Sequence, residues 1–298
     1  MTHGRGHYDV VVAEGFGGSR IPRLTPLYVR EPILTEWHQV HRDLFAAQYP
    51  KVLGGPLNLL ERTTARFHRN TLVRAGTVEW KSAFEGLGFK PEKIFVVPVS
   101  IREDWLSERD DGPVKRPRIL WLGKVRRYKR PDHAIRAMAS VVKQIPKAQL
   151  TVAGRPDDGA YGRELEKLAA DLGLEDNVTF LFNLSEGSKQ DLIRRQRVLV
   201  VPSAVEGFGI VVLEANALGV PVIASSGVPE GAVRHGMNGL RYPYGDIPAL
   251  AANICQVLQD DDLYARLSEA GRVFARKFAW RKVGAQYAEY VERAARKG

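Results

Sequence analysis

The chain has 298 residues, of which 44% are hydrophobic and 26% are charged, so it has enough apolar side chains for packed cores and is not a disordered chain. Lysine and arginine exceed aspartate and glutamate by 44 − 34 = 10, which predicts anionic partners such as nucleotides or lipid headgroups. The single cysteine, Cys255, excludes an intrachain disulfide, and no apolar run approaches the roughly 20 residues that cross a bilayer.

The first hundred residues alternate short apolar segments with helical patterns. We expect strands at residues 8–13, 26–29, 71–75 and 94–97, and helices at residues 35–48, 56–69 and 77–87. Four strands make a thin sheet for a nucleotide-binding domain. The next stretch, residues 102–117, is polar and rich in turn residues, which is typical of an interdomain linker.

Residues 118–242 show the alternation most clearly. Strands are expected at residues 119–122, 149–153, 178–182, 198–202, 221–224 and 239–242. Helices separate them, including one that opens near Pro131 and one that ends at Gly173. This pattern predicts an α/β domain with a doubly wound parallel sheet, covered by helices on both faces. From Asp246 the chain is expected to be helical, with an interruption at residues 279–281 before a last helix.

Two common nucleotide-binding motifs are absent from the sequence. The glycines at residues 15–18 and 207–209 lack the third glycine of the dinucleotide fingerprint, and no GxxxxGK[ST] segment occurs. The acidic triplet at residues 260–262 could be a metal site, but its place between two expected helices favours a helix cap and turn. We therefore do not expect this triplet to bind a metal ion.

The strongest signal is a loop and a helix that follow the strand at residues 198–202. Gly207 and Gly209 lie between two carboxylates, Glu206 and Glu214. Ligands of open α/β sheets bind at this end of the strands, and a helix start offers N–H groups and a partial positive charge suited to a pyrophosphate. The carboxylates would then hold hydroxyl groups on either side of the phosphates. By itself, the segment is equally compatible with a charged N-cap and one surface glutamate.

The surrounding segments add a family resemblance. The block from Pro202 to Ala215 resembles the E-x7-E signature of the retaining glycosyltransferases of family 4, the glycosyl transferases group 1, which have the GT-B fold. The similarity extends over residues 122–132, 150–154, 219–224, 227–230, 236–240 and 278–280. The resemblance implies two Rossmann-like doubly wound domains, the N-terminal one incomplete.

The resemblance implies a role for each matching position. Glu206 would contact hydroxyls of the donor sugar, and Glu214 would hold the ribose of the nucleotide. Lys129 would neutralise the diphosphate as charge builds on the leaving group. Lys124 stands where the family normally has arginine, so it keeps the charge but loses the bidentate fork. The other implied donor-site positions are Gly123, Gly154, Leu181, Phe182, Gly207, Phe208, Gly209 and Ile210, with the base received near residues 181–183.

The N-terminal part resembles only the second half of the family's acceptor domain. Residues 9–12, 26–29 and 96–99 match successive strands, and the family's opening strands have no match in this sequence. The family's histidine falls at Arg30, while His38 and His41 are expected on a helix surface. The expected organisation is a partial N-terminal domain at residues 1–101, a linker at 102–117, a donor-binding domain at 118–278 and a C-terminal helix at 279–298 that packs back towards the N-terminal domain.

The function implied is transfer of a sugar from a nucleotide-diphosphate donor to an acceptor hydroxyl, with retention at the anomeric carbon. The nucleotide sugar is a co-substrate, with no separate cofactor and no metal ion, and the acceptor would be a glycan or a lipid-linked sugar. Two alternatives stay open. One is a donor-binding subunit or inactive remnant that needs a partner for transfer, and the other is a GT-B epimerase or phosphorylase.

Two features of the sequence concern the cellular location of the protein: a basic helix face and the N-terminal residues. Arg62, Arg66 and Arg69 recur at helical spacing and could contact an anionic membrane, although an ordinary exposed helix shows the same pattern. No nucleic-acid-binding signature accompanies the positive charge. The first residues do not resemble a signal peptide, so we expect a cytoplasmic protein, with a peripheral place on the inner membrane face as a second interpretation.

Overall fold

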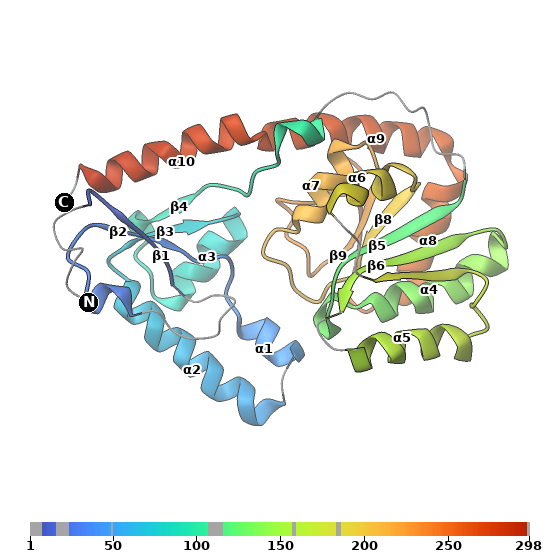
Figure 1. Ribbon diagram of the computed structural model, residues 1–298, viewed down its shortest axis with the longest axis horizontal. Coiled ribbons are helices and arrows are strands. Elements are labelled where there is room, and N and C mark those ends of the chain that lie inside the picture. Colours follow the sequence, from blue (N-terminus) through green and yellow to red (C-terminus); the bar gives the residue numbers. More distant parts are fainter. Residues whose placement is uncertain are drawn as a thin grey trace. The chain divides into compact units, whose positions relative to one another are not determined.

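The computed structural model describes residues 8–15, 24–48, 50–106, 116–156, 159–182 and 186–296. The chain forms two compact units, one of Met1–Ser100 with Trp280–Gly298 and one of Ile101–Ala279. Each unit is built on a parallel β-sheet with helices packed against it, so the predicted α/β class is confirmed (Figure 1).

The smaller unit contains a four-stranded parallel sheet in the order β1-β2-β3-β4. The strands are β1 (Val11–Glu14), β2 (Ile33–Glu36), β3 (Leu72–Ala75) and β4 (Ile94–Val96). The helices are α1 (Arg42–Gln48), α2 (Lys51–His68), α3 (Val78–Leu87) and α10 (Trp280–Ala295). Short 3-10 turns lie at η1 (Thr25–Leu27) and η2 (Pro91–Lys93).

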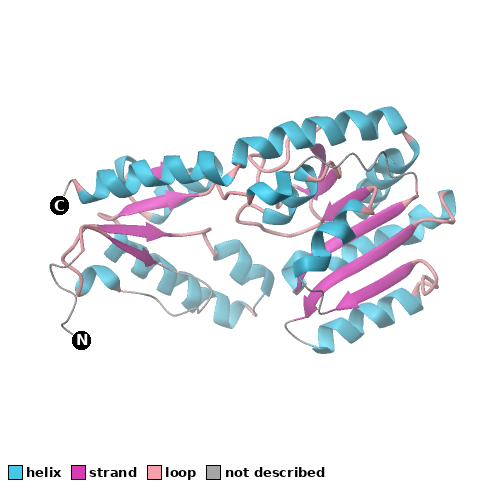
Figure 2. Ribbon diagram, turned by 45° about the horizontal axis from the view of Figure 1, so that its top comes forward, coloured by secondary structure: helices cyan, strands magenta, loops and turns pink. Residues whose placement is uncertain are grey.

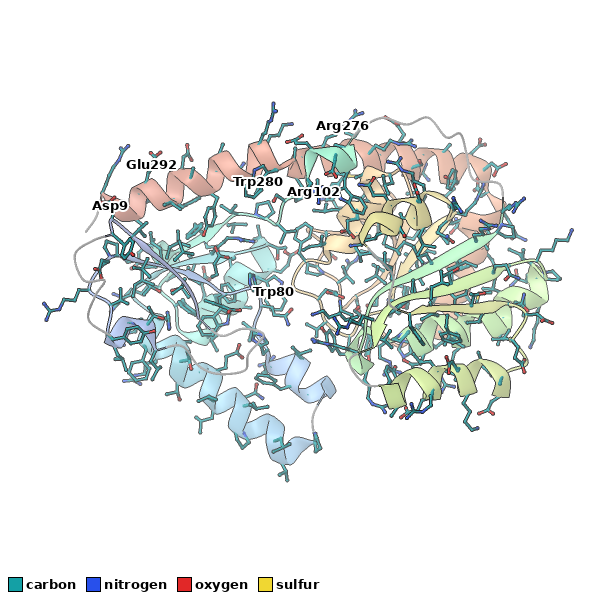
Figure 3. The ribbon with its side chains drawn as sticks, in the orientation of Figure 1. Asp9, Trp80, Arg102, Arg276, Trp280 and Glu292 are labelled. Carbon is teal, nitrogen blue, oxygen red and sulfur yellow. The ribbon has the colours of Figure 1, made fainter. Side chains whose placement is uncertain are left out.

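Alternating side chains give this sheet two separate cores. Val73 and Ile94 point to one face, where they pack with Phe84 of α3 and other buried residues. Leu34 and Phe95 point to the opposite face, which α10 covers. There the rings of Phe95 and Tyr290 stack with centroids 4.0 Å apart. Figure 3 marks the length of α10 by Trp280 in its first turn and Glu292 near its end.

The second strand of this sheet lies elsewhere than predicted from the sequence. The strand expected at residues 26–29 is wrong: Pro26 lies in the 3-10 turn η1, and β2 runs from Ile33 to Glu36 instead. The helix expected from Thr35 begins only at Arg42. Proline supplies no N–H and favours the first positions of a helical turn, whereas the β-branched Ile33 and Thr35 suit a strand.

The predicted linker at residues 102–117 is described in part. Residues 103–106 form the 3-10 turn η3 (Glu103–Leu106), whose Trp105 is buried in the larger unit. Ile101 donates its N–H to the carbonyl of Phe278 at 2.8 Å, so both ends of the larger unit meet. Residues 107–115 lie outside the described residues.

The larger unit contains a six-stranded parallel sheet in the order β10-β9-β8-β5-β6-β7. The strands are β5 (Arg118–Val125), β6 (Gln149–Pro156), β7 (Val178–Phe182), β8 (Val198–Val201), β9 (Val222–Ser225) and β10 (Gly239–Tyr242), so all six expected strands are confirmed. The helices are α4 (Pro131–Gln144), α5 (Gly159–Asp171), α6 (Glu186–Arg194), α7 (Ile210–Ala217), α8 (Ile247–Gln259) and α9 (Asp261–Ala275), with short 3-10 turns at η4 (Arg127–Lys129) and η5 (Arg276–Phe278).

Helices cover both faces of this sheet (Figure 2). Helices α4 and α8 pack against each other, as do α7 and α9. The sheet interior is aliphatic: Ile119, Val198 and Ile223 are fully buried on three neighbouring strands. A parallel sheet buried on both faces produces the continuous apolar runs that made these strands predictable.

The acidic triplet is a helix cap, as predicted. Asp260 is the N-cap of α9, and its side chain accepts the Leu263 N–H at 2.8 Å. Within the described residues, no three His, Cys, Asp or Glu side chains form a group that could hold a metal ion.

We predict that Asp260→Ala lowers the free energy of unfolding by about 1 kcal/mol, because the Leu263 N–H loses its side-chain acceptor. Asp262→Ala is the matched control, since it removes only a charge from the first turn and is expected to cost a few tenths of a kcal/mol. Urea denaturation measures both. Equal losses for the two variants would contradict the cap assignment.

Candidate functional site

The strand order of the larger unit indicates where on the sheet edge a ligand would bind. The chain runs from β5 outward through β6 to β7, then returns and runs outward on the other side from β8 through β9 to β10. β5 and β8 are neighbours, with Ile119 beside Val198. Ligands of open α/β sheets bind beyond the carboxyl ends of the strands at such a reversal, because the two loops diverge there.

Backbone hydrogen bonds join the loops that leave this edge. Ala204, after β8, donates its N–H to the carbonyl of Tyr128, after β5, at 2.7 Å. Ser225, at the end of β9, donates its hydroxyl to the carbonyl of Ser203 at 2.5 Å. Glu206 donates its N–H to the carbonyl of Gly227 at 3.0 Å. The loop that carries Glu206 is therefore fixed from both neighbouring strands.

Helix α7 begins immediately after this loop. Its N-cap is Gly209, whose φ of 85° lies in the left-handed region that glycine adopts without strain. The side chain of Phe208 is turned into the core, where its ring lies 5.3 Å from that of Phe278. As predicted, Glu206 precedes the helix and Glu214 lies within it. The positive end of the helix dipole therefore lies between the two carboxylates in sequence.

Glu206 is paired with Lys129, although 77 positions separate them in sequence. The Lys129 ammonium lies 2.6 Å from Oε1 of Glu206, and the Ser203 hydroxyl donates to the same oxygen at 2.8 Å. Glu206 is 8% exposed. Burial by itself lowers the pKa of Lys129, but attraction to the Glu206 carboxylate outweighs burial and raises that pKa above its usual value. Lys129 is thus a cation at neutral pH.

The backbone around Lys129 is fixed as firmly as its side chain. The indole of Trp121 donates to the Lys129 carbonyl at 3.2 Å. The next residue, Arg130, has a φ of 52°, which costs a non-glycine residue about 1 kcal/mol. Its guanidinium donates to both oxygens of Asp132, at 2.9 and 2.7 Å, and to the Tyr244 hydroxyl at 3.3 Å. These bonds offset the strain and hold the turn that presents Lys129.

Glu214 has a lysine of its own. The Lys189 ammonium, on α6, lies 2.6 Å from Oε1 of Glu214. Glu214 is 7% exposed, so both carboxylates of the motif are buried and each is neutralised by one lysine. Sequence reasoning missed Lys189 and Ser203, because only the packing of α6 and the loop against α7 brings them to these carboxylates.

The remaining predicted positions lie along the same sheet edge. Gly123 and Gly154 are paired across β5 and β6, and Phe182 is paired with Gly154 at the end of β7. A Cβ on Gly154 would lie 1.8 Å from the Gly123 carbonyl oxygen, so close strand approach explains this glycine without a ligand. Leu181 is partly exposed, and Asn183 lies outside the described residues. Lys124 is exposed near the end of β5, and among the described residues its side chain forms no ion pair with either carboxylate.

The structure also corrects the prediction that Arg30 follows a strand, at the place where the family has a histidine. Arg30 precedes β2 instead of following it, and the residues that follow β2 are Trp37 and His38. His41 lies before α1, not on a helix surface, and it is tied to the buried Glu61 of α2 through its ring at 2.8 Å and its backbone N–H at 3.0 Å. The error has one cause, the misplaced second strand.

The arrangement at the β5–β8 edge suits one kind of ligand. A helix N-terminus and a charged lysine favour an anionic centre, and buried carboxylates favour hydroxyl groups as hydrogen-bond donors. A nucleotide sugar has this distribution, with a ribose and a sugar on either side of a diphosphate. The fold is therefore that of an α/β protein of the GT-B type, and the charges at its β5–β8 edge suit a ligand of this kind.

Comparison with known proteins agrees with this class. Residues 106–274 match the family described as Glycosyl transferases group 1, and the chain belongs to that family. It therefore falls in the enzyme class of glycosyltransferases.

Two similar curated proteins are both named D-inositol 3-phosphate glycosyltransferase. The protein from Streptomyces scabiei is 29% identical over 96% of this chain and 68% of its own length. The protein from Thermobispora bispora is 36% identical over 58% of this chain and 42% of its own length. The chain thus spans only part of these relatives.

Solved structures share the fold at low sequence identity. Sucrose-phosphate synthase from Thermosynechococcus elongatus superposes with a TM-score of 0.82 at 22% identity, covering 99% of this chain and 76% of that one. Anabaena HepE in complex with UDP-glucose superposes with a TM-score of 0.78 at 19% identity, covering 96% and 79%. The GT-B fold predicted from the sequence is confirmed.

We predict that Lys129→Met and Glu206→Gln each lower the free energy of unfolding by about 1–3 kcal/mol, because each leaves the other group buried without its charged partner. The double variant should lose less than the sum. Because the Lys129 pKa is raised, the contribution of the pair should stay constant from pH 7 to 10 and fall only above pH 10.5.

Urea denaturation of the two single variants and the double variant measures this coupling. Lys167→Met is the matched control, since its ion pair with Asp171 is exposed and should contribute under about 0.5 kcal/mol. Strictly additive losses would show that Lys129 and Glu206 do not stabilise each other.

Proposed function

We propose that this chain transfers a sugar from a nucleotide-diphosphate donor to an acceptor hydroxyl, with retention of configuration at the anomeric carbon. The observation that carries the proposal is the Lys129–Glu206 pair, 2.6 Å apart, at the loop that opens α7. It joins a cation for the diphosphate to a carboxylate for sugar hydroxyls at the sheet edge where ligands bind. Family membership favours transfer over a subunit that only binds the donor.

Each group has a distinct role in this reaction. The bond between the anomeric carbon and the diphosphate oxygen breaks as the acceptor oxygen bonds to that carbon, and the acceptor proton passes to a phosphate oxygen. Lys129 has three N–H donors, of which one serves Glu206, so the others can reach the diphosphate. Together with the N-terminus of α7 and Lys124, it would stabilise the charge that develops on the leaving group.

The two carboxylates would contact different parts of the donor. Glu206 would accept hydrogen bonds from hydroxyls of the transferred sugar, and Glu214 from the ribose. The base would lie near Leu181 and Phe182 at the end of β7. Acceptors to be tested are glycans, lipid-linked sugars and an inositol phosphate, the last suggested by the name of the curated relatives.

The surface of α2 supports contact between this enzyme and an anionic membrane. Val52 and Leu59 are 82% and 67% exposed, and Leu53, Leu60 and Phe67 are also exposed. Arg62, Arg66 and Arg69 flank this apolar stripe, and all three are exposed. The acidic residue of α2, Glu61, is buried. An apolar stripe with arginines and no exposed acid fits a lipid surface better than water. None of the described helices is long and apolar enough to cross a bilayer.

We predict that calorimetric titration with UDP, GDP and ADP shows micromolar binding of one nucleotide. Glu214→Ala should weaken that binding by about 1.5–3 kcal/mol, as expected for a hydrogen bond to a charged group. Glu206→Ala should leave the bare nucleotide unaffected and reduce discrimination among its sugar conjugates. Identical nucleotide affinities for wild type and Glu214→Ala would refute the site, and release of nucleotide without glycosylated product would refute transfer.

We predict that the wild-type chain co-sediments with vesicles of 30% phosphatidylglycerol but not with pure phosphatidylcholine. Replacing Arg62, Arg66 and Arg69 by glutamine should weaken binding on the order of a hundredfold, at about 1 kcal/mol for each charge. Leu59→Ser should weaken it as well, whereas Val78→Ser, which alters an exposed apolar residue on α3, should not. Unchanged sedimentation of the triple variant would rule out this surface, and self-association lost on Leu59→Ser would indicate a second copy as the occupant.

A further inference from the structure

Lys189 is the cation that no sequence motif indicated at the donor site. It lies in α6, and its ammonium donates to Oε1 of Glu214 at 2.6 Å. The two side chains are 20% and 10% exposed. A pair so shielded from water is stronger than the exposed pairs of the surface helices, which are screened.

A buried aromatic ring supports the ammonium from another side. The Lys189 nitrogen lies 5.6 Å from the ring centroid of Trp105, within the range of a cation–π contact. Trp105 is buried on η3, which packs against α7. Three elements therefore meet at one nitrogen atom: α6 supplies it, α7 supplies the carboxylate, and η3 supplies the ring.

The geometry repeats that of the other carboxylate. Lys129 and Glu206 are also 2.6 Å apart, with the same exposures of 20% and 10%. In both pairs, the lysine comes from a different element than the carboxylate and contacts Oε1. A carboxylate fixed through one oxygen has lost most of its rotational freedom before a ligand arrives, so less entropy is lost when hydroxyls bind it.

We propose that Lys189 is a positioning residue for recognition of the ribose: by donating to Oε1, it holds the Glu214 carboxylate in the orientation that accepts hydrogen bonds from the ribose hydroxyls. The inference rests on the proposed function, since it requires Glu214 to contact the nucleotide. Lys189 acts through Glu214, not by contact with the reacting atoms. Loss of the Lys189 ammonium should therefore weaken the binding of ligands that have ribose hydroxyls more than the binding of ligands that lack them.

The test compares a ribonucleoside diphosphate with its 2′,3′-dideoxy counterpart, using the base that the wild type binds. Calorimetry gives both dissociation constants. The dissociation constant of the dideoxy ligand divided by that of the ribonucleotide measures recognition of the ribose hydroxyls. Lys189→Met should lower this ratio about tenfold, Lys189→Arg should preserve it, and Lys167→Met, which alters an exposed lysine, should leave it unchanged. With Glu214→Gln already present, Lys189→Met should change the ratio no further.

The possible outcomes separate this inference from the proposed function. A change in packing or in overall charge would weaken both ligands alike, so a ratio within twofold of wild type in Lys189→Met overturns the inference. If the wild type binds no nucleotide, the proposed function fails and the inference fails with it. Should Lys189→Met not fold, Lys189→Gln, which keeps a donor without the charge, replaces it and should also lower the ratio.

Discussion

The reversal of strand order between β5 and β8 is the constraint on which the rest of the site depends. Because these neighbouring strands are parallel, the loops that follow them leave from the same edge. The bond from the Ala204 N–H to the Tyr128 carbonyl fixes the two loops to each other. Lys129 and Glu206 can then form an ion pair although 77 positions separate them in sequence.

The second requirement of this arrangement is that its buried carboxylates be neutralised, and lysines do so. A carboxylate in a nearly dry environment is stable only with a cation and hydrogen-bond donors close by. Glu206 has Lys129 and Ser203, and Glu214 has Lys189. Under the proposed function, a nucleotide sugar would engage these same groups while both lysine–carboxylate pairs persist, so binding would leave no buried charge without a partner.

The smaller unit shows where sequence reasoning fails. In the larger unit, the inner strands β8 and β9 are buried at every position and each adjoins a proline, so their apolar runs could be predicted from the sequence. In the smaller unit, the segment around Pro26 and the true strand at Ile33 both offer four suitable residues. Only pairing of Leu34 with β1 and β3 decides between them, and that pairing is not local.

The sequence by itself determined the α/β class, the six strands of the larger unit, and the loop and helix that carry Glu206 and Glu214, because periodicity and glycine spacing are local properties of the chain. Tertiary structure alone decided which lysine meets which carboxylate. Lys189 lies on an ordinary polar helix, and no pattern in its neighbourhood marks it. It reaches Glu214 because α6 and α7 pack together, and such packing depends on contacts between residues distant in sequence.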